Sequence, residues 1–252
     1  MGSPGIRLRR DLEGDVLVLR FHHPLTRNAL DRATRAALVD ELEAADADPG
    51  VRAVVLTGVD PAFTSGVDAK QLLGDHDYRP LPLDPATCLR AMSTPTIAAV
   101  NGACVSGGLE IALACSFVIA SERALFADTH AALGLSPGWG LSVELPAAIG
   151  VHRARRMALT GEVIPAAVAE RWGLVSEVVA HGDLTTRMME LAAAVARHDP
   201  RSVRHAVGLY RDGRDVVLAP AFATEQRALQ EWRVDRDAAG GRFAQSVSPP
   251  ST

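Results

Sequence analysis

The chain has 252 residues, of which 48% are hydrophobic and 22% are charged, a composition typical of a globular protein with one large domain or two small ones. Its formal net charge is −4 and only 4% of its residues are aromatic. Neither a basic field nor a base-stacking surface therefore indicates a nucleic-acid partner.

The cysteines and the first ten residues bear on where the protein works. Cys88, Cys104 and Cys115 form no C-x-x-C pair and lie in apolar stretches, so we expect buried free thiols in a reducing compartment. The N-terminus has no apolar signal core, and the chain has no run of 18 apolar residues that would cross a membrane. We therefore expect a cytoplasmic protein that does not act at a membrane.

Hydrophobic patterning predicts alternating strands and helices in the first third of the chain. Alternation predicts strands at residues 6–11 and 15–21, joined by a hairpin at Glu13-Gly14. Asp31 is placed to cap a helix that ends near residue 48, and a short apolar strand follows at 51–57. Short helices are predicted near 69–73 and at 85–93, on either side of an aperiodic loop at 74–85 that we interpret as a lid.

Residues 58–70, GVDPAFTSGVDAK, combine a strand end, a glycine-bearing turn and a helix start. Gly66 supplies a permissive backbone, so the Val67 N–H can point outward beside it. The positive charge of Lys70 lies close by, where it is available to a phosphate. An ordinary surface loop would show much the same pattern.

The most informative stretch is residues 101–115, NGACVSGGLEIALAC, which follows an apolar strand predicted at 96–100. Gly107-Gly108 opens a helix predicted at 109–114, where unpaired N–H groups let a ligand oxygen approach. Glu110 is the only ionisable residue in this stretch. The pattern predicts an oxyanion site with an acid–base residue beside it. The alternative is structural: the glycines permit tight packing and Glu110 caps its own helix.

The second half of the chain begins with predicted strands at 117–121 and 124–127, and Asp128-Thr129-His130 follows at a strand end. Residues 136–140, SPGWG, form a predicted turn. Helices are predicted at 143–149, 152–160 and 164–172, and Glu144 is interpreted as a solvent-facing residue. A last strand is predicted at 176–179. From 183 to 237 we expect helix, interrupted at Pro200, Gly213 and Pro220, and then a frayed end from 246 to 252.

Several of these stretches together resemble the enoyl-CoA hydratase/isomerase family, the crotonase superfamily. The matching segments are Pro24, the run Asn28-Ala29-Leu30, PAFTSGVDAK, AAVNGACVSGGLEIALACSFVIASERALFAD, GLSPGWG and HDPRSVRHAVGL. The resemblance covers the chain from Arg7 to about Trp232.

The resemblance implies an α/β fold, a crotonase-like spiral of ββα units with a C-terminal helical region. It implies a core at residues 1–185 that carries the CoA-ester site, and a helical region at 186–252 that serves oligomerisation and acts as a lid. It also implies a homotrimer or a dimer of trimers, and a role in fatty acid metabolism such as β-oxidation. No cofactor or metal is expected, because coenzyme A enters as part of the acyl-CoA substrate.

The family stabilises a thioester enolate with two backbone N–H groups, and the resemblance assigns these donors to Val67 and Gly107. Gly108 would let the helix start pack closely. The remaining substrate- and CoA-binding residues implied by the resemblance are Thr26, Arg27, Ser65, Gly66, Asp68 and Lys70.

Family hydratases use two glutamates about one water molecule, and this chain departs from that pattern. One glutamate corresponds to Glu110, but the position of the other is His130. Asp128 is the nearest possible substitute, but residues two apart in a strand share a face at different depths. We therefore expect that Asp128 and His130 cannot occupy one point. As alternatives, His130 is a hydrogen-bonded structural residue and Asp128 caps a turn.

Four functions remain open at this stage. In a 2-enoyl-CoA hydratase, Glu110 would activate water while His130 holds that water or returns a proton to Cα. In a Δ3,Δ2-enoyl-CoA isomerase, Glu110 alone would move a proton between Cα and Cγ. A catalytically silent subunit would bind CoA esters without chemistry. A generic doubly wound α/β domain would have no affinity for CoA.

Overall fold

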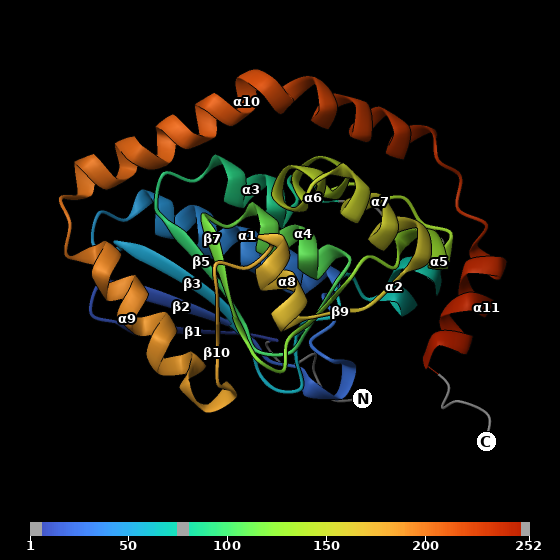
Figure 1. The fold of residues 1–252 in the computed structure, drawn as a ribbon, viewed down its shortest axis with the longest axis horizontal. Helices are drawn as coiled ribbons and strands as arrows, with labels where there is room; N and C mark the ends of the chain where they lie inside the picture. Colours follow the sequence, from blue (N-terminus) through green and yellow to red (C-terminus); the bar gives the residue numbers. More distant parts are fainter. Residues whose placement is uncertain (1–6, 75–80, 248–252) are drawn as a thin grey trace.

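The computed structural model describes residues 7–74 and 81–247 (Figure 1). Residues 75–80 of the predicted lid and residues 248–252 of the predicted frayed end lie outside the described residues.

A six-stranded sheet forms the centre of the fold, in the order β1-β2-β3-β5-β7-β10. The first two strands are an antiparallel hairpin, as predicted, and every other neighbouring pair is parallel. The bounds are β1 Leu8–Glu13, β2 Val16–Phe21, β3 Ala53–Gly58, β5 Thr96–Val100, β7 Phe117–Ser121 and β10 Glu177–Val179.

A second sheet of four short strands has the order β4-β6-β8-β9. Its strands are β4 Ala62–Thr64, β6 Ala103–Val105, β8 Leu125–Ala127 and β9 Ile164–Pro165. Along the chain, β3, β5 and β7 of the large sheet are followed by β4, β6 and β8 of the small one, and then by a helix. This repetition of strand, strand and helix confirms the expected spiral of ββα units.

The described helices surround these sheets. Their bounds are α1 Arg32–Ala47, α2 Ala69–Gly74, α3 Pro85–Ala91, α4 Gly107–Ala114, α5 His130–Leu133, α6 Leu141–Ile149, α7 Val151–Thr160, α8 Ala166–Trp172, α9 Leu184–Ala196, α10 Pro200–Glu231 and α11 Arg236–Val247, with short 3-10 turns at Pro24–Thr26 and His181–Asp183. Among the described residues, none of the helices has both the length and the apolarity needed to cross a bilayer.

Two predicted helix boundaries were wrong. The helix expected from residue 164 begins at Ala166, because Ile164 and Pro165 pair with β8 instead. The interruptions expected at Gly213 and Pro220 do not occur, and α10 continues through both. Pro220 removes the hydrogen bond to the carbonyl of Val216, but Val216 is 84% exposed, so water can satisfy that carbonyl.

The large sheet is covered on both faces, as the period-two pattern of its strands requires. Val16 and Val18 of β2 face α9, where Leu184 and Met188 are buried against them. The intervening Leu17 and Leu19 belong to the main core on the opposite face, together with residues of α1, α3 and α4. Cys88, Cys104 and Cys115 are buried free thiols, which confirms that prediction.

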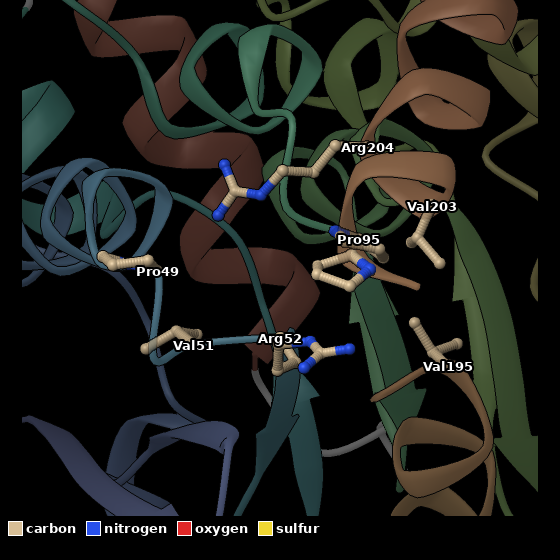
Figure 2. Close-up of a pocket in the computed structure, with 8 residues that line it drawn as sticks. Pro49, Val51, Arg52, Pro95, Val195, Val203 and Arg204 are labelled. Atoms are coloured by element: carbon tan, nitrogen blue, oxygen red, sulfur yellow. The ribbon is translucent and has the colours of Figure 1, made fainter. Parts of the chain in front are cut away.

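The turn between α9 and α10 is fixed to the edge of the core at a small cleft (Figure 2). There the Arg52 side chain donates to the His198 carbonyl at 2.5 Å, and Arg204 of α10 donates to the Asp46 carbonyl at 3.2 Å. From this anchor α10 runs as a long arch over α3 and α6 (Figure 1). The C-terminal helices are thereby held over the face of the core that carries the site described next.

Candidate active site

Two backbone bends meet at the centre of the candidate site. Val67 follows β4, and Gly107 is the first residue of α4. A Cβ atom placed on Gly107 would lie 3.4 Å from the Val67 nitrogen, so the two amide nitrogens are within about 6 Å of each other. One oxygen can bridge that separation with two hydrogen bonds of about 2.9 Å each.

Both amides are free to donate. Within residues 7–74 and 81–247, neither the Val67 N–H nor the Gly107 N–H has a protein acceptor. The bend around Val67 is held by its neighbours, since Leu30 donates to the Gly66 carbonyl at 2.8 Å and Asp68 donates to the Leu30 carbonyl at 3.0 Å. The structure therefore brings the two predicted donors together with their hydrogen-bonding capacity unused.

The start of α4 is shaped by close packing and by an unusual serine. A Cβ atom on Gly108 would lie 2.5 Å from the Thr64 carbonyl oxygen, so only glycine allows α4 to pack this closely on β4. Ser106, directly before α4, has a φ of 48°, which is rare for a residue with a side chain. Its hydroxyl accepts from the Thr129 N–H at 3.0 Å, which ties α4 to the segment after β8. No sequence signal predicted this role for Ser106.

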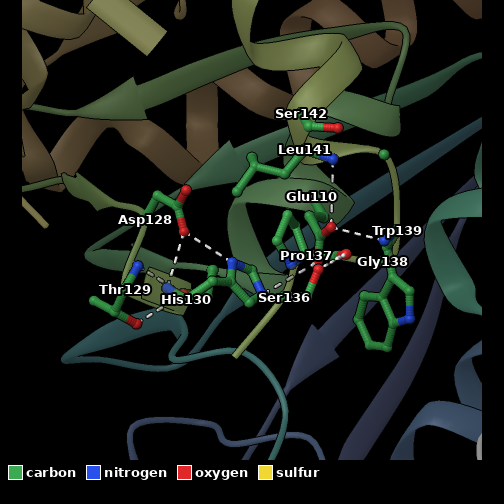
Figure 3. A network of polar contacts seen from close by, with 12 residues as sticks. Glu110, Asp128, Thr129, His130, Ser136, Pro137, Gly138, Trp139, Leu141 and Ser142 are labelled. Atoms are coloured by element: carbon green, nitrogen blue, oxygen red, sulfur yellow. Dashed lines mark hydrogen bonds and ion pairs between the residues drawn. The ribbon is translucent and has the colours of Figure 1, made fainter. Parts of the chain in front are cut away.

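Glu110 lies in the first turn of α4 and is 3% exposed. One of its carboxylate oxygens accepts from the Trp139 N–H at 2.7 Å and from the Leu141 N–H at 3.3 Å (Figure 3). The carboxylate therefore holds a different segment, and the alternative that it caps its own helix is wrong. Burial raises the pKa of Glu110 to about 7, although His130 and the two amides oppose the rise.

His130 is placed beside Glu110 and held by Asp128, which confirms the alternative that Asp128 caps a turn. The strand ends at Ala127 and His130 begins α5, so the period of two no longer applies. Asp128 Oδ1 accepts from the His130 N–H at 3.0 Å and lies 2.8 Å from its Nδ1 (Figure 3). The other ring nitrogen, Nε2, lies 4.0 Å from Glu110 Oε2.

The surroundings of His130 favour its protonated form. Burial lowers the pKa of His130, but the hydrogen bond to Asp128 and the nearby Glu110 carboxylate outweigh burial, so the net pKa is raised. Asp128, His130 and Glu110 thus form a continuous line of side chains that ends on α4, the helix whose first residue, Gly107, supplies one of the free amides.

Trp139 contributes its side chain as well as its amide to the site. Its indole carbon Cζ3 would lie 3.1 Å from a Cβ atom on Gly107, so the ring covers the oxyanion bend. The sequence identified the SPGWG segment only as a turn with one aromatic residue. Nothing in its composition showed that the amides of Trp139 and Leu141 would bind Glu110.

Three of the residues that the resemblance assigns to CoA binding, Thr26, Arg27 and Ser65, lie together. The Ser65 N–H donates to the Arg27 carbonyl at 3.0 Å, and the Ser65 hydroxyl donates to the Thr26 carbonyl at 3.2 Å. Arg27 has a left-handed backbone conformation with a φ of 53°. The 3-10 turn and the loop after β4 therefore form one continuous surface next to Gly66 and Val67.

Asp68 and Lys70 lie at the start of α2. Asp68 accepts from the Lys70 N–H at 3.0 Å and from the Gln71 N–H at 3.3 Å, and it lies 3.7 Å from an Arg7 guanidinium nitrogen. Its carboxylate thus caps α2, whereas the exposed side chain of Lys70 is left on the surface beside the loop that carries Val67.

The interpretation of Glu144 as a solvent-facing residue was wrong. Glu144 is 9% exposed and lies 3.2 Å from Arg214 of α10. Burial raises its pKa and the Arg214 charge opposes the rise. The pattern of α6 could not predict this, because α10, which lies about 70 residues later in the chain, covers the polar face of that helix.

No group of three or more histidine, cysteine, aspartate or glutamate side chains is placed to hold a metal ion in the part of the chain that the structure describes. The groups that the structure brings to this region are two amide donors, one buried carboxylate and one imidazole.

Comparison with known proteins gives a consistent result. The family model described as enoyl-CoA hydratase/isomerase matches residues 11–244. A 2,3-dehydroadipyl-CoA hydratase of Escherichia coli is 35% identical over 243 residues, which are 93% of this chain and 94% of that protein.

Solved structures agree in fold. An enoyl-CoA hydratase from Mycobacterium tuberculosis H37Rv superposes with a TM-score of 0.83 and 42% identity, over 90% of this chain and 99% of that one. A monofunctional enoyl-CoA isomerase from M. smegmatis gives a TM-score of 0.72 and 32% identity, over 83% of this chain and 94% of that one. The chain therefore belongs to the enoyl-CoA hydratase/isomerase family, the crotonase superfamily.

Proposed function

We propose that the protein is an enoyl-CoA hydratase that adds water across the double bond of a 2-enoyl-CoA thioester. The observation that carries this proposal is the buried Glu110 carboxyl, with a pKa of about 7, which lies 4.0 Å from His130 on the helix that begins at Gly107. The free amides of Gly107 and Val67 adjoin each other at the start of that helix. Relatives named as hydratases support the same reaction class.

The thioester carbonyl accepts hydrogen bonds from the Val67 and Gly107 N–H groups. Negative charge develops on this oxygen as the enolate forms, so both donors bind the enolate more strongly than the neutral substrate. Each well-placed donor of this kind is worth about 3 kcal/mol in the transition state.

Glu110 and His130 divide the proton transfers. Ionised Glu110 takes a proton from water, and the hydroxide equivalent bonds to Cβ while the double bond becomes the enolate. His130, in its imidazolium form, then donates its Nε2 proton to Cα. Proton transfer from Glu110 Oε2 to His130 Nε2, which lie 4.0 Å apart, runs through one bridging water and restores both groups. Asp128 acts on the opposite ring nitrogen and holds Nε2 toward the reaction.

A Δ3,Δ2-enoyl-CoA isomerase is the second candidate. One specific observation favours it: Glu110 is the single carboxylate held by the Trp139 and Leu141 amides, with a histidine in place of a second glutamate. In that reaction Glu110 alone carries a proton between Cα and Cγ. The M. smegmatis isomerase shows that this chemistry occurs on a similar fold.

The CoA part of the substrate is proposed to lie along the surface formed by Thr26, Arg27 and Ser65, with Lys70 against the phosphates. No cofactor besides the substrate is part of the proposal. The three buried free cysteines are consistent with a reducing compartment such as the cytoplasm. A place in fatty acid metabolism such as β-oxidation is proposed from the family alone.

A homotrimer, or a dimer of such trimers, is proposed as the assembly. Helix α10 exposes large apolar side chains that a single chain leaves in water; these are Leu209, Tyr210, Val216 and Val217. Burial of this stripe against other copies of the chain would account for the length of the helix. The molar mass in solution, measured by light scattering, tests the proposal directly.

The reaction is tested with two substrates. Incubation with crotonyl-CoA should remove the enoyl absorbance as the 3-hydroxyacyl product forms, and a 3-enoyl-CoA should give little change. Turnover of the 3-enoyl substrate alone would establish the isomerase instead. Binding of acyl-CoA without turnover of either substrate would indicate a silent subunit.

A further inference from the structure

Helix α10 holds one buried residue in its 32-residue length, and that residue is a glutamate, Glu225. Carboxylates are almost never this buried without a partner. No ion pair among residues 7–74 and 81–247 involves Glu225. Its partners are instead donors from the loop that enters α6.

Glu225 binds that loop with both carboxylate oxygens. One oxygen accepts from the Gly140 N–H at 2.6 Å, and the other accepts from the Ser142 N–H at 2.8 Å and from the Ser142 hydroxyl. These amides belong to the first turn of α6, where a helix leaves its N–H groups without internal partners.

The two carboxylates divide four consecutive amides between them. Glu110 receives the N–H groups of residues 139 and 141, and Glu225 receives those of residues 140 and 142. The same peptide segment is thus held from one side by the catalytic helix α4 and from the other by α10. A shift of the segment away from Glu225 necessarily moves the amides that bind Glu110.

Other contacts place α10 close against this segment. Gln226 donates to the Gly138 carbonyl at 2.6 Å, and Arg90 of α3 donates to the Trp139 carbonyl at 2.7 Å. A Cβ atom on Gly138 would lie 2.4 Å from a Leu229 methyl carbon, so the Leu229 side chain packs directly against Gly138. These contacts bind carbonyls, whereas Glu225 is the group of α10 that binds the amides.

We propose that Glu225 is a positioning residue for Glu110, which it serves by holding residues 139–142 so that the Trp139 and Leu141 amides reach the catalytic carboxylate. The inference rests on the proposed hydratase function for its kinetic readout. The position of α10 on the core would then affect the geometry around Glu110 through one peptide segment, residues 139–142.

Kinetics of Glu225→Gln and Glu225→Ala test the inference. Because the thioester is held by Val67 and Gly107, KM should stay within about threefold while kcat falls. Displacement of the amides in Glu225→Ala should lower kcat about a hundredfold. Glu225→Gln keeps one acceptor oxygen, so its kcat should fall only about tenfold. The matched control is Glu231→Gln, an exposed acid at the end of the same helix, which should leave both constants unchanged.

A double-mutant cycle shows whether Glu225 acts through Glu110. If it does, adding Glu225→Ala to Glu110→Gln should lower the residual rate by less than about twofold. A full multiplicative loss in the double variant would overturn the positioning role, as would a Glu225→Ala enzyme with parental kcat. Should Glu225→Ala fail to fold, the isosteric Glu225→Gln carries the same comparison.

Amide hydrogen exchange separates this inference from the proposed function. Residues 139–142 should exchange faster in Glu225→Ala and at the parental rate in Glu231→Gln, whether or not crotonyl-CoA is turned over. A parent without turnover would therefore refute the hydratase proposal alone. Unchanged exchange at 139–142 in Glu225→Ala would refute the positioning role alone.

Discussion

The carboxyl group of Glu110 balances two opposed influences. Burial favours its neutral form, whereas His130 and the Trp139 and Leu141 amides favour the carboxylate. The result is a pKa of about 7, at which a single group takes and returns a proton with little loss in either direction. The sequence placed Glu110 in an apolar helix. It could not show whether the pKa of Glu110 is raised or lowered, because the groups that oppose burial come from residues 130, 139 and 141.

That shift predicts how stability depends on pH. Glu110 has a pKa of about 7 in the folded protein and an ordinary value of 4.5. Its contribution to the free energy of unfolding is therefore fully present below pH 4.5 and is lost as pH rises through 7. Glu110→Gln removes this titration. It should therefore gain stability relative to the parent between pH 5 and pH 8, by at most about 3 kcal/mol.

Urea unfolding at pH 5, 6 and 8 measures this difference. The exposed acid Glu231 supplies the control, because Glu231→Gln should give the same difference from the parent at all three pH values. A difference between Glu110→Gln and the parent that stays constant from pH 5 to pH 8 would mean that Glu110 titrates normally in the folded protein.

His130 is predicted to act in the reaction and not only in the fold. His130→Gln should lower kcat for hydration about a hundredfold, because the imidazolium that protonates Cα is removed. KM should change little, since the ring does not hold the thioester. The control is His152→Gln, an exposed histidine on α7. Parental kcat with a lowered melting temperature in His130→Gln would assign the residue to structure.

At the scale of elements, the patterns that succeeded are local ones. Asp31 caps α1 by accepting from the Thr34 N–H at 2.8 Å, as the N-cap signal predicted. The strands at β2, β5 and β7 were likewise predicted, since each is a clear apolar run. By contrast β4 and β6 are three residues long, too short to show a period. They are strands because β4 pairs with β6 and β6 also pairs with β8.

The close approach of α4 to β4 is predicted to be essential. Gly108→Ala puts a methyl group 2.5 Å from the Thr64 carbonyl oxygen, so the helix start must shift by an ångström or so and carry the Gly107 amide with it. A shift of that size should lower kcat/KM about a hundredfold. Gly213→Ala, in open space on α10, should instead raise stability by about 1 kcal/mol.

Steady-state kinetics and thermal melts on both glycine variants check this pair. Gly108→Ala with parental kcat/KM would show that the position of the α4 start does not limit the reaction. Gly213→Ala with a lowered melting temperature would show that α10 does not have the open surface found at that position.

At the scale of the whole molecule, the sequence could not predict the path of α10 across the core. Its helical character was predictable, but its continuity through Pro220 and its docking over α3 and α6 were not. That docking buries Glu144 and Glu225 and fixes the loop that binds Glu110. Contacts between residues 139–142 and residue 225 span more than 80 positions, beyond any local pattern.

The sequence predicted the central residues of the site better than the residues that hold them in place. Val67 and Gly107 lie side by side with Glu110 and His130 around them, as the resemblance implied. The turn-capping role offered for Asp128 is confirmed, but its contact with the His130 ring was not predicted, because the strand ends one residue before Asp128 and its carboxylate turns back onto His130. The residues that the resemblance assigned to the reaction therefore lie near one another in the fold, and their catalytic roles stay predictions. The groups that hydrogen-bond to Glu110 and His130 emerged only from the folded chain.

The most direct measurement is the turnover of crotonyl-CoA by the parent and by Glu110→Gln, combined with the binding of a non-reactive acyl-CoA to both. Because Glu110 moves the proton while two amides hold the thioester, kcat should fall at least about a hundredfold and Kd should stay within about threefold. A Glu110→Gln enzyme with parental turnover would contradict the central role of the carboxyl in the reaction.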